Sequence, residues 1–192
     1  MRLVLGSASP RRRDLLGQIG VVPNQIAPAD IDETPAKAEL PRIYVERMAR
    51  EKNAAVQSDG LILTADTVVS AGRRILGKPE DATEAAQFLM LLSGRRHRVT
   101  TSVCLRDGET LRQRTVETLV KMKRLSDHEL SAYLRSNEWQ GKAGGYAIQG
   151  IGSALIPEIN GSYTNVVGLP LTETANLLIG MGYPVSFEGT PA

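Results

Sequence analysis

The sequence has few features of disulfide-bonded, metal-cluster or membrane proteins. Cys104 is the single cysteine of the 192 residues, which excludes an internal disulfide and a thiolate metal cluster. No segment approaches the roughly 18 apolar residues of a membrane span, and no apolar secretory core precedes the first predicted strand. A net charge of +2 does not favour a surface that coats nucleic acid. We therefore expect a cytoplasmic protein with Cys104 buried in a strand.

Common motifs of nucleotide-binding and hydrolytic enzymes are also missing. The stretch from residue 72 to residue 78 fits the first seven positions of a P-loop, but Pro79 stands where a Ser or Thr must bind magnesium. A hairpin turn is expected there, in place of the strand-to-helix context of a P-loop. The two histidines, His97 and His128, are too isolated in the chain for a triad or a zinc site, and we expect both at the surface.

Apolar strands alternate with amphipathic helices, which predicts an α/β fold. Asp107-Gly108 and Asn160-Gly161 predict hairpin turns, so the sheet is expected to be mixed. A chain of 192 residues can form one domain or two small lobes, and we expect a long twisted sheet flanked by helices. The expected strands are Leu3 to Leu5, Leu61 to Ala65, Val99 to Leu105 and Glu109 to Leu125. The expected helices are Pro10 to about Ile19, Pro41 to Ala55, Asp81 to Leu92, Ser126 to about Ser136 and Leu171 to Gly180.

Three consecutive arginines stand at the start of the first predicted helix, behind Ser9 as N-cap and Pro10. A helix N-terminus carries a partial positive charge, so cations there are unfavourable by a few tenths to about 1 kcal/mol each. A bound polyanion would reverse that effect. Successive helical side chains diverge by about 100°. Three consecutive arginines therefore cannot all reach one ligand.

Other charged or polar side chains stand where predicted strands and helices end, which is where α/β folds hold their ligands. Each alone would more often be a solvated surface residue, but together they predict a cleft that holds both cations and carboxylates. Such a cleft suits a polyphosphate bound with Mg²⁺ or Mn²⁺, and a carboxylate there can activate water for attack on phosphorus. The residues are Asp30, Asp32, Glu33, Glu51, Lys52, Asp66, Lys78, Lys142 and Gln149.

Eight short motifs, in order along nearly the whole chain, carry a family resemblance. They are Ser7-x-Ser9-Pro10-Arg11-Arg12, Asp32-Glu33, Arg50-Glu51-Lys52, Ala65-Asp66-Thr67-Val68, Gly77-Lys78-Pro79 with Asp81, Ser93-Gly94, Gly145-Tyr146-Ala147-Ile148-Gln149-Gly150 and Val167-Gly168-Leu169-Pro170. This set resembles the Maf family of nucleoside triphosphate pyrophosphatases. The resemblance implies the elongated α/β fold shared with inosine-triphosphate pyrophosphatases, as a single domain over residues 1–192 with two lobes around a cleft. It also implies a homodimer and metal-dependent cleavage of a nucleoside triphosphate to the monophosphate and pyrophosphate.

The resemblance also implies a role for individual residues. Asp66 matches the proton acceptor, and the metal, Mg²⁺ or Mn²⁺, would be held by Glu33 and Asp66. Lys52 and Lys78 match catalytic, phosphate-contacting lysines. The expected substrate-binding residues are Ser7, Arg11, Arg12, Thr67 and Gln149. Arg13 is an arginine additional to the family pattern, and we expect it to lie on the outer face of its helix.

Three of these positions divide the family by substrate. Arg12, Thr67 and Gln149 resemble the branch that acts on dTTP and UTP, whereas the 7-methyl-GTP branch has Trp near the arginines, Gln after the aspartate and Glu in place of Gln149. A glutamine amide suits the O4/N3 edge of a pyrimidine because it offers both a donor and an acceptor. We expect hydrolysis of dTTP and UTP, with modified pyrimidine triphosphates able to share the pocket.

The expected biological role is house-cleaning of the nucleotide pool, with a link to cell division arrest. Two alternatives stay open from sequence alone. One is a pyrophosphatase with another base preference, such as 7-methyl-GTP. The other is a non-enzymatic regulator of cell division that binds nucleotides or nucleic acid through its arginines. Neither a membrane nor a stable nucleic-acid partner is expected.

Overall fold

A computed structural model describes residues 1–188, so the last four residues of the expected domain lie outside the described part. The strands are β1 (Leu3–Leu5), β2 (Gln25–Ile26), β3 (Leu61–Ala71), β4 (Arg74–Leu76), β5 (Arg96–Asp107), β6 (Thr110–Lys121) and β7 (Glu158–Asn160). The α-helices are α1 (Pro10–Gln18), α2 (Pro41–Ala55), α3 (Ala82–Leu92), α4 (Asp127–Arg135), α5 (Tyr163–Val167) and α6 (Leu171–Gly180). Two short 3₁₀ helices are η1 (Ala143–Gly145) and η2 (Ile151–Leu155).

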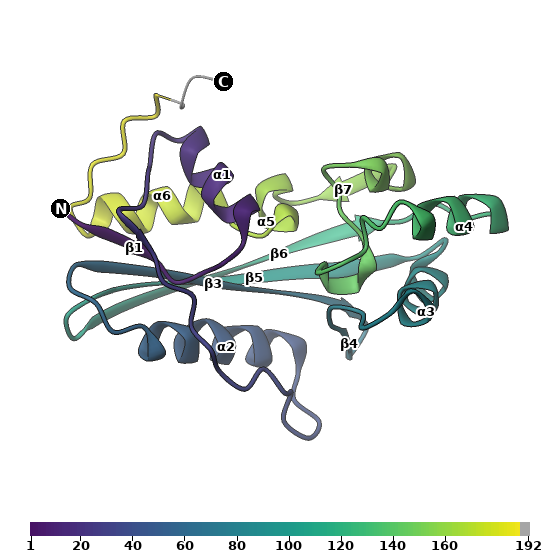
Figure 1. Ribbon diagram of the computed structural model, residues 1–192, viewed down its shortest axis with the longest axis horizontal. Coiled ribbons are helices and arrows are strands. Elements are labelled where there is room, and N and C mark those ends of the chain that lie inside the picture. Colours follow the sequence, from purple (N-terminus) through teal and green to yellow (C-terminus); the bar gives the residue numbers. More distant parts are fainter. Residues whose placement is uncertain (189–192) are drawn as a thin grey trace.

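The strands form one mixed sheet in the order β2-β1-β3-β5-β6-β7, with β4 also paired to β3 (Figure 1). β1 runs parallel to both β2 and β3, whereas the other pairs are antiparallel. Strands β3, β5 and β6 are long and lie along the longest axis of the molecule. The predicted elongated α/β architecture with a mixed sheet flanked by helices is therefore confirmed.

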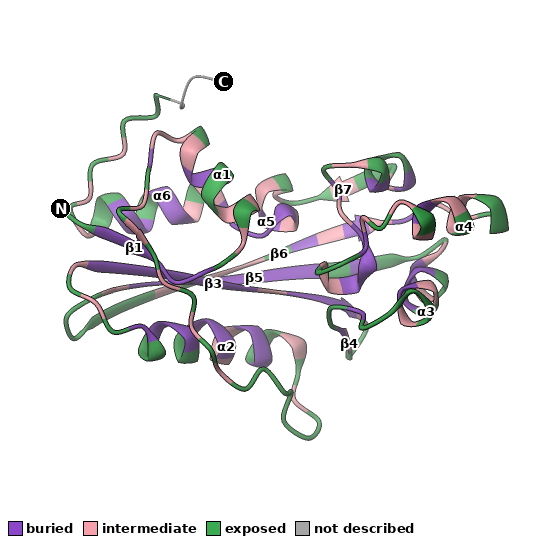
Figure 2. Ribbon diagram, in the orientation of Figure 1, coloured by how far each residue is buried: buried purple, intermediate pink, exposed green. Residues whose placement is uncertain are grey.

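Helices cover both faces of the sheet. α1 and α6 lie on one face and α2 on the other (Figure 1). Side chains alternate along a strand, so Leu61, Leu63 and Ala65 of β3 pack with α1 and α6 in one apolar core. On the opposite face, Val68 packs with Tyr44 and other residues of α2 in a smaller core. Buried residues follow β3 and β5 through the middle of the molecule (Figure 2).

The pairing of β3 leaves a gap along one side of this strand. β1 pairs with residues 61–63 and β4 with residues 69–71, so neither strand covers residues 64–68. On its other side, β3 pairs continuously with β5. Asp66 and Thr67 lie in the gap, and their side chains point to opposite faces of the sheet. Residues from both faces can therefore reach a common space at this edge.

Most expected elements are present, including the capping box of Ser126 and Glu129 at the start of α4. Asp66 is not at the end of its strand, because β3 continues through pairing with β5 up to Ser70 and with β4 up to Ala71. The return strand ends at Lys121, short of the expected Leu125, because the next residues bond to loops outside the ladder.

Two further expectations were wrong. The predicted hairpin at Asn160-Gly161 does not form, because Ser162 caps α5 directly after this dipeptide. His97 is buried, with 1% of its surface exposed, whereas His128 is exposed as expected.

Cys104 is buried in β5, as predicted. Across residues 1–188, no helix combines the length and the hydropathy needed to cross a membrane.

Candidate active site

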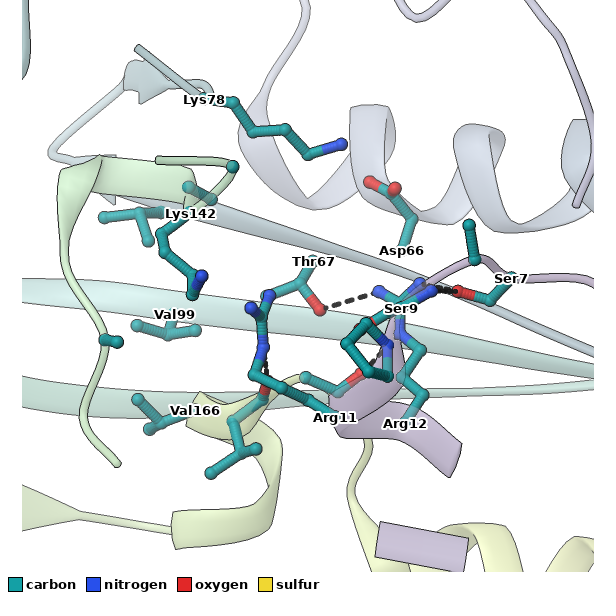
Figure 3. A pocket seen from close by; sticks show the side chains of 18 of the residues that line it. Ser7, Ser9, Arg11, Arg12, Asp66, Thr67, Lys78, Val99, Lys142 and Val166 are labelled. Carbon is teal, nitrogen blue, oxygen red and sulfur yellow. Dashed lines mark hydrogen bonds between the residues drawn. The ribbon is translucent and has the colours of Figure 1, made fainter. Parts of the chain in front are cut away.

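A cleft of about 460 Å³ opens at the gap in the sheet, and residues from distant parts of the chain line it. Every residue that the family resemblance assigned to the site contributes to this lining, whereas Asp30, Asp32 and Glu51, which the charge pattern also placed in the cleft, are not part of it. The lining residues that the resemblance assigned are Ser7, Arg11, Arg12, Glu33, Lys52, Asp66, Thr67, Lys78 and Gln149. Lys142 and Tyr146 line the same cleft. Figure 3 shows Arg11 and Arg12 on one side of the cleft and the ammonium group of Lys78 directed toward Asp66 from another.

Main-chain oxygens at the C-terminal end of α5 accept hydrogen bonds from Arg11 and Arg12, the two inner arginines that line the cleft. Arg11 Nε donates to Val167 O at 3.3 Å, and Arg12 Nε donates to Gly168 O at 2.9 Å. The carbonyls at a helix C-terminus carry partial negative charge, so they partly offset the unfavourable place of these arginines in α1. Arg13 lies exposed beside Asp14, with 3.9 Å between Nε and Oδ1, and it faces away from the cleft as expected.

Neutral oxygens also surround the rest of the Arg12 guanidinium group. Nη1 donates to Ser7 Oγ at 3.0 Å and Nη2 to Thr67 Oγ1 at 3.2 Å (Figure 3). Burial lowers the pKa of Arg12, an effect that the charge of Asp66 opposes and the charge of Arg11 reinforces. Within residues 1–188, neither inner arginine forms an ion pair with a carboxylate. The cleft therefore contains positive charge that the protein itself leaves unneutralised.

Ser7 offers a hydrogen-bond donor to the cleft. Its Oγ accepts from Arg12 Nη1 and also from the main-chain N–H of Ser9, at 3.3 Å. A serine hydroxyl has two lone pairs and one hydrogen. Because both lone pairs are engaged, the hydrogen of Ser7 is the group left for a ligand. A phosphate oxygen would accept that hydrogen.

Lys52 bridges the two acidic side chains of the site. From the last part of α2, its Nζ lies 2.6 Å from Asp66 Oδ1 and 3.0 Å from Glu33 Oε1. Lys52 and Asp66 are both buried, whereas Glu33 comes from the loop between β2 and α2 and is partly exposed. One ammonium group thus holds the two carboxylates close to each other through a shared positive charge.

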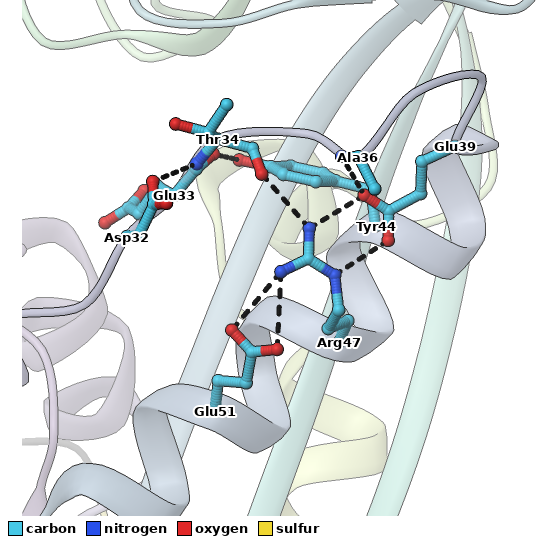
Figure 4. A network of polar contacts seen from close by, with 8 residues as sticks. All are labelled: Asp32, Glu33, Thr34, Ala36, Glu39, Tyr44, Arg47 and Glu51. Carbon is cyan, nitrogen blue, oxygen red and sulfur yellow. Dashed lines mark hydrogen bonds and ion pairs between the residues drawn. The ribbon is translucent and has the colours of Figure 1, made fainter.

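A polar network anchors the loop that carries Glu33 (Figure 4). Arg47 of α2 donates to Glu39 at 2.7 and 2.8 Å and to the carbonyl of Thr34 at 3.2 Å. The hydroxyl of Tyr44 donates to the carbonyl of Glu33 itself at 2.9 Å. The Arg47 guanidinium lowers the pKa of Glu39 to about 2, so this carboxylate stays charged at neutral pH. The network fixes the loop to α2 and thereby sets where Glu33 lies.

Lys142 and Tyr146 form a further part of the cleft lining. Burial lowers the pKa of Lys142, and the nearby charge of Arg11 lowers it further. Tyr146 is 5% exposed, and its hydroxyl lies 2.6 Å from His97 Nε2. Burial raises the pKa of the Tyr146 phenol, so the ring forms a neutral part of the wall. The sequence pointed to Lys142 only through its glycine-rich surroundings.

The donor set suits a hard divalent cation that the substrate helps to bind. Within residues 1–188, no three His, Cys, Asp or Glu side chains form a metal-binding group. Mg²⁺ is usually bound through one or two carboxylates, with phosphate oxygens and waters as the other ligands. Glu33 and Asp66 provide two carboxylates that already share one cation, the ammonium of Lys52. The residues present therefore fit Mg²⁺ or Mn²⁺ bound together with a polyphosphate.

Sequence reasoning missed two residues behind the cleft. Thr101 of β5 contacts Thr67, and Glu138 accepts hydrogen bonds from the main-chain N–H groups of Ile151 and Gly152, next to the segment that carries Gln149. The cross-strand position of Thr101 follows only from the register of β3 and β5. Glutamate is a residue type common at protein surfaces, so nothing in the sequence around Glu138 indicates its contact with Ile151, 13 residues further along the chain.

Comparison with known proteins gives consistent matches over almost the whole chain. Residues 2–181 match the model of the Maf-like protein family. A dTTP/UTP pyrophosphatase of Cereibacter sphaeroides is 62% identical over 187 residues, which cover 96% of this chain and 97% of the relative. A dTTP/UTP pyrophosphatase of Rhodopseudomonas palustris strain HaA2 is 54% identical over 196 residues, with 97% and 95% covered. This chain belongs to the Maf family.

Proposed function

We propose that this protein hydrolyses dTTP and UTP to the nucleoside monophosphate and pyrophosphate. The relatives with 54–62% identity bear the name of this activity. The observation that carries the proposal is a cleft in which Arg11 and Arg12 have no carboxylate partner among residues 1–188, beside the buried carboxylate of Asp66 that Lys52 holds in place. Such a cleft favours a triphosphate, because phosphate oxygens neutralise the cations and accept their N–H groups.

In this proposal the cationic residues bind the triphosphate chain. Arg11 and Arg12 stand at the N-terminal end of α1, where main-chain N–H groups also favour anions. The hydroxyl hydrogen of Ser7 points to a phosphate oxygen. Lys78 supplies a further positive charge close to Asp66. These contacts position the substrate and neutralise the charge that develops on the departing pyrophosphate.

Asp66 is proposed to accept a proton from the attacking water. The oxygen of this water forms a bond with the α-phosphorus, and the bond from that phosphorus to the α–β bridging oxygen breaks, which releases pyrophosphate. Lys52 holds Asp66 through Oδ1 at 2.6 Å and keeps the carboxylate oriented. No covalent intermediate with the protein is needed.

Glu33 and Asp66 would hold Mg²⁺ or Mn²⁺ when the substrate is bound. Such an ion neutralises phosphate charge and polarises phosphoryl oxygens. The protein's own contribution is to keep both carboxylates close together, through Lys52, and to hold the Glu33 loop against α2 through Arg47 and Tyr44.

The base preference is proposed to depend on Gln149, Thr67 and Arg12, which all line the cleft. By the same resemblance, we propose that the chain is one domain with two lobes, acts in the cytoplasm and forms a homodimer. House-cleaning of pyrimidine triphosphates, including modified ones, fits an enzyme with this substrate class.

The proposal is tested by pyrophosphate release from a panel of canonical and modified nucleoside triphosphates, with Mg²⁺ and Mn²⁺ in separate reactions. The Asp66→Asn variant should lose about 10²- to 10⁴-fold in kcat, because general-base catalysis contributes that much. Glu33 remains to pair with Lys52, so the fold should persist, as circular dichroism can check. The control is Asp107→Asn, at the exposed hairpin between β5 and β6, which should keep full activity.

Two results would contradict the proposal. Unchanged turnover in Asp66→Asn would remove this carboxylate from the reaction. A purine preference, for 7-methyl-GTP in particular, would refute the assignment of Arg12, Thr67 and Gln149. A non-enzymatic regulator that binds nucleic acid should instead show no turnover and a binding constant that falls steeply with salt.

A further inference from the structure

A chain of hydrogen bonds runs from Arg12 along one face of the sheet to α5. Arg12 Nη2 lies 3.2 Å from Thr67 Oγ1, which lies 2.9 Å from Thr101 Oγ1. Thr101 Oγ1 in turn lies 3.1 Å from the main-chain oxygen of Asn165. Thr67 and Thr101 are direct cross-strand partners on β3 and β5, so their side chains share one face of the sheet. Thr101 and Asn165 are completely buried.

Hydrogen counting fixes the direction of every bond in this chain. The carbonyl of Asn165 can only accept, so Thr101 must donate its single hydroxyl hydrogen there. Thr101 then has none left for Thr67, and Thr67 must donate in the bond between the two hydroxyls. A guanidinium group can only donate, so Thr67 accepts from Arg12.

This result determines what Thr67 can offer to a ligand. Its hydrogen is directed into the protein and one lone pair is used by Arg12, so one lone pair remains for the cleft that Thr67 lines. Ser7 is the opposite case, because its two lone pairs are used and its hydrogen remains. An acceptor-only hydroxyl repels a phosphate oxygen. It requires a hydrogen-bond donor.

We infer that Thr101 is a positioning residue that makes Thr67 an acceptor, so that the nucleotide presents an N–H or O–H donor to Thr67. The inference rests on the proposed function and deepens it. In both UTP and dTTP this donor can be the imide N3–H of the base or the 3′-hydroxyl of the sugar. Cytosine has an acceptor at N3, so Thr67 held in this orientation would reject cytosine if the donor is N3–H, and would not discriminate against it if the donor is the 3′-hydroxyl.

The test compares the parent protein with Thr101→Val, which keeps the shape of the side chain but removes the hydroxyl. Thr67 then loses its internal acceptor and can turn its hydrogen toward the cleft. Turnover is measured with UTP, with CTP, which lacks N3–H, and with 3′-deoxy-UTP, which lacks the 3′-hydroxyl. We expect one of two turnover ratios, UTP to CTP or UTP to 3′-deoxy-UTP, to be roughly two- to tenfold smaller in Thr101→Val than in the parent. This is the range that the net contribution of one hydrogen bond implies.

The substrate whose ratio changes identifies the donor. A narrower UTP-to-CTP ratio assigns it to the base, and a narrower ratio of UTP to 3′-deoxy-UTP assigns it to the sugar; either result supports the inference. If both ratios in Thr101→Val equal those of the parent, the inference is wrong. Thr101→Ser keeps a hydroxyl and should restore the parent ratios.

A double-mutant cycle separates positioning from a purely structural effect. If Thr101 acts through Thr67, the change Thr101→Val should leave the ratios unaltered in a Thr67→Val background. The matched control is Thr100→Val, because Thr100 is equally buried in β5 but points to the opposite face of the sheet. Smaller turnover ratios in Thr100→Val than in the parent would overturn the inference. So would an effect of Thr101→Val on the ratios that is undiminished in the Thr67→Val background.

Two further measurements keep the outcome decisive. Thr101→Ala is a smaller hydroxyl-free variant for use if Thr101→Val does not fold, as judged from its melting temperature. Calorimetry with the α,β-imido analogues of UTP and CTP reports the same ratio as a binding preference without turnover. A parent protein that hydrolyses neither UTP nor dTTP refutes the proposed function, whereas equal binding ratios in parent and variant refute the role of Thr101.

Discussion

Acidification should destabilise the protein through His97 of β5. The imidazole is buried, packs edge-on against the Tyr146 ring, and has an Nδ1 without a hydrogen-bond partner within residues 1–188. Burial lowers the pKa of His97 to about 4, from an ordinary value of 6.5. Between these two values the unfolded chain binds a proton that the folded protein does not. The free energy of unfolding is therefore fully retained above pH 6.5 and falls as the pH drops toward 4.

The size of this effect follows from the two pKa values. One pKa unit corresponds to about 1.36 kcal/mol, and pH 5 lies 1.5 units below the unfolded pKa. At pH 5 the folded imidazole is still almost entirely neutral. His97 alone should thus remove about 2 kcal/mol of stability between pH 7.5 and pH 5.

Urea unfolding at pH 7.5 and pH 5 measures this loss in the parent protein and in His97→Gln. Glutamine does not titrate, and its amide can still form a hydrogen bond with the Tyr146 hydroxyl. The carboxylates change the free energy of unfolding by the same amount in both proteins. The loss of this free energy between pH 7.5 and pH 5 should therefore be about 2 kcal/mol larger in the parent than in His97→Gln. An equal loss in the two proteins would show that the folded imidazole takes up its proton normally, and would refute the reasoning.

Other predictions concern the loops around the cleft. In Gly152→Ala the added Cβ would lie 2.2 Å from the main-chain oxygen of Ala147, and in Gly150→Ala it would lie 2.0 Å from Glu138 Oε1. A flexible carboxylate can move away, whereas main chain cannot. Thermal melts should therefore show a larger fall in Tm for Gly152→Ala than for Gly150→Ala. The reverse order would contradict this prediction. Arg47→Met should raise the Mg²⁺ concentration for half-maximal activity by roughly tenfold, because it frees the loop that carries a metal-facing carboxylate; an unchanged metal titration would contradict that role.

The position of Asp66 shows what an apolar pattern can and cannot predict. The run from Leu61 to Ala65 correctly marked a buried strand, and the polar residues after it were interpreted as the strand's end. The strand in fact continues, because β5 pairs with it up to Ser70. Polar side chains are tolerated in its middle because neither β1 nor β4 covers residues 64–68. This gap depends on the lengths of two other strands, which no local pattern contains.

The dipeptide Asn160-Gly161 illustrates a conflict between local signals. Asn-Gly is the strongest short signal for a two-residue hairpin. Here Ser162 follows directly and its side chain accepts from the main-chain N–H of Asn165, which starts a helix. Gly161 is still required, since its φ is 129° and an added Cβ would lie 2.8 Å from Thr118 Oγ1. The sequence signal marked a real change of direction, and the N-cap decided what followed it.

The arginines of α1 show why the residues that line the candidate site were easier to predict than the contacts that hold them in place. Their place in a first turn indicated an anion site from sequence alone. The ligand is not the sole compensation, however. The carbonyls of Val167 and Gly168, 156 residues away in the chain, accept from Arg11 and Arg12. Carbonyls satisfy N–H groups but leave a full positive charge in place. The protein without ligand can thus hold both side chains ready, while their charge remains available for a triphosphate.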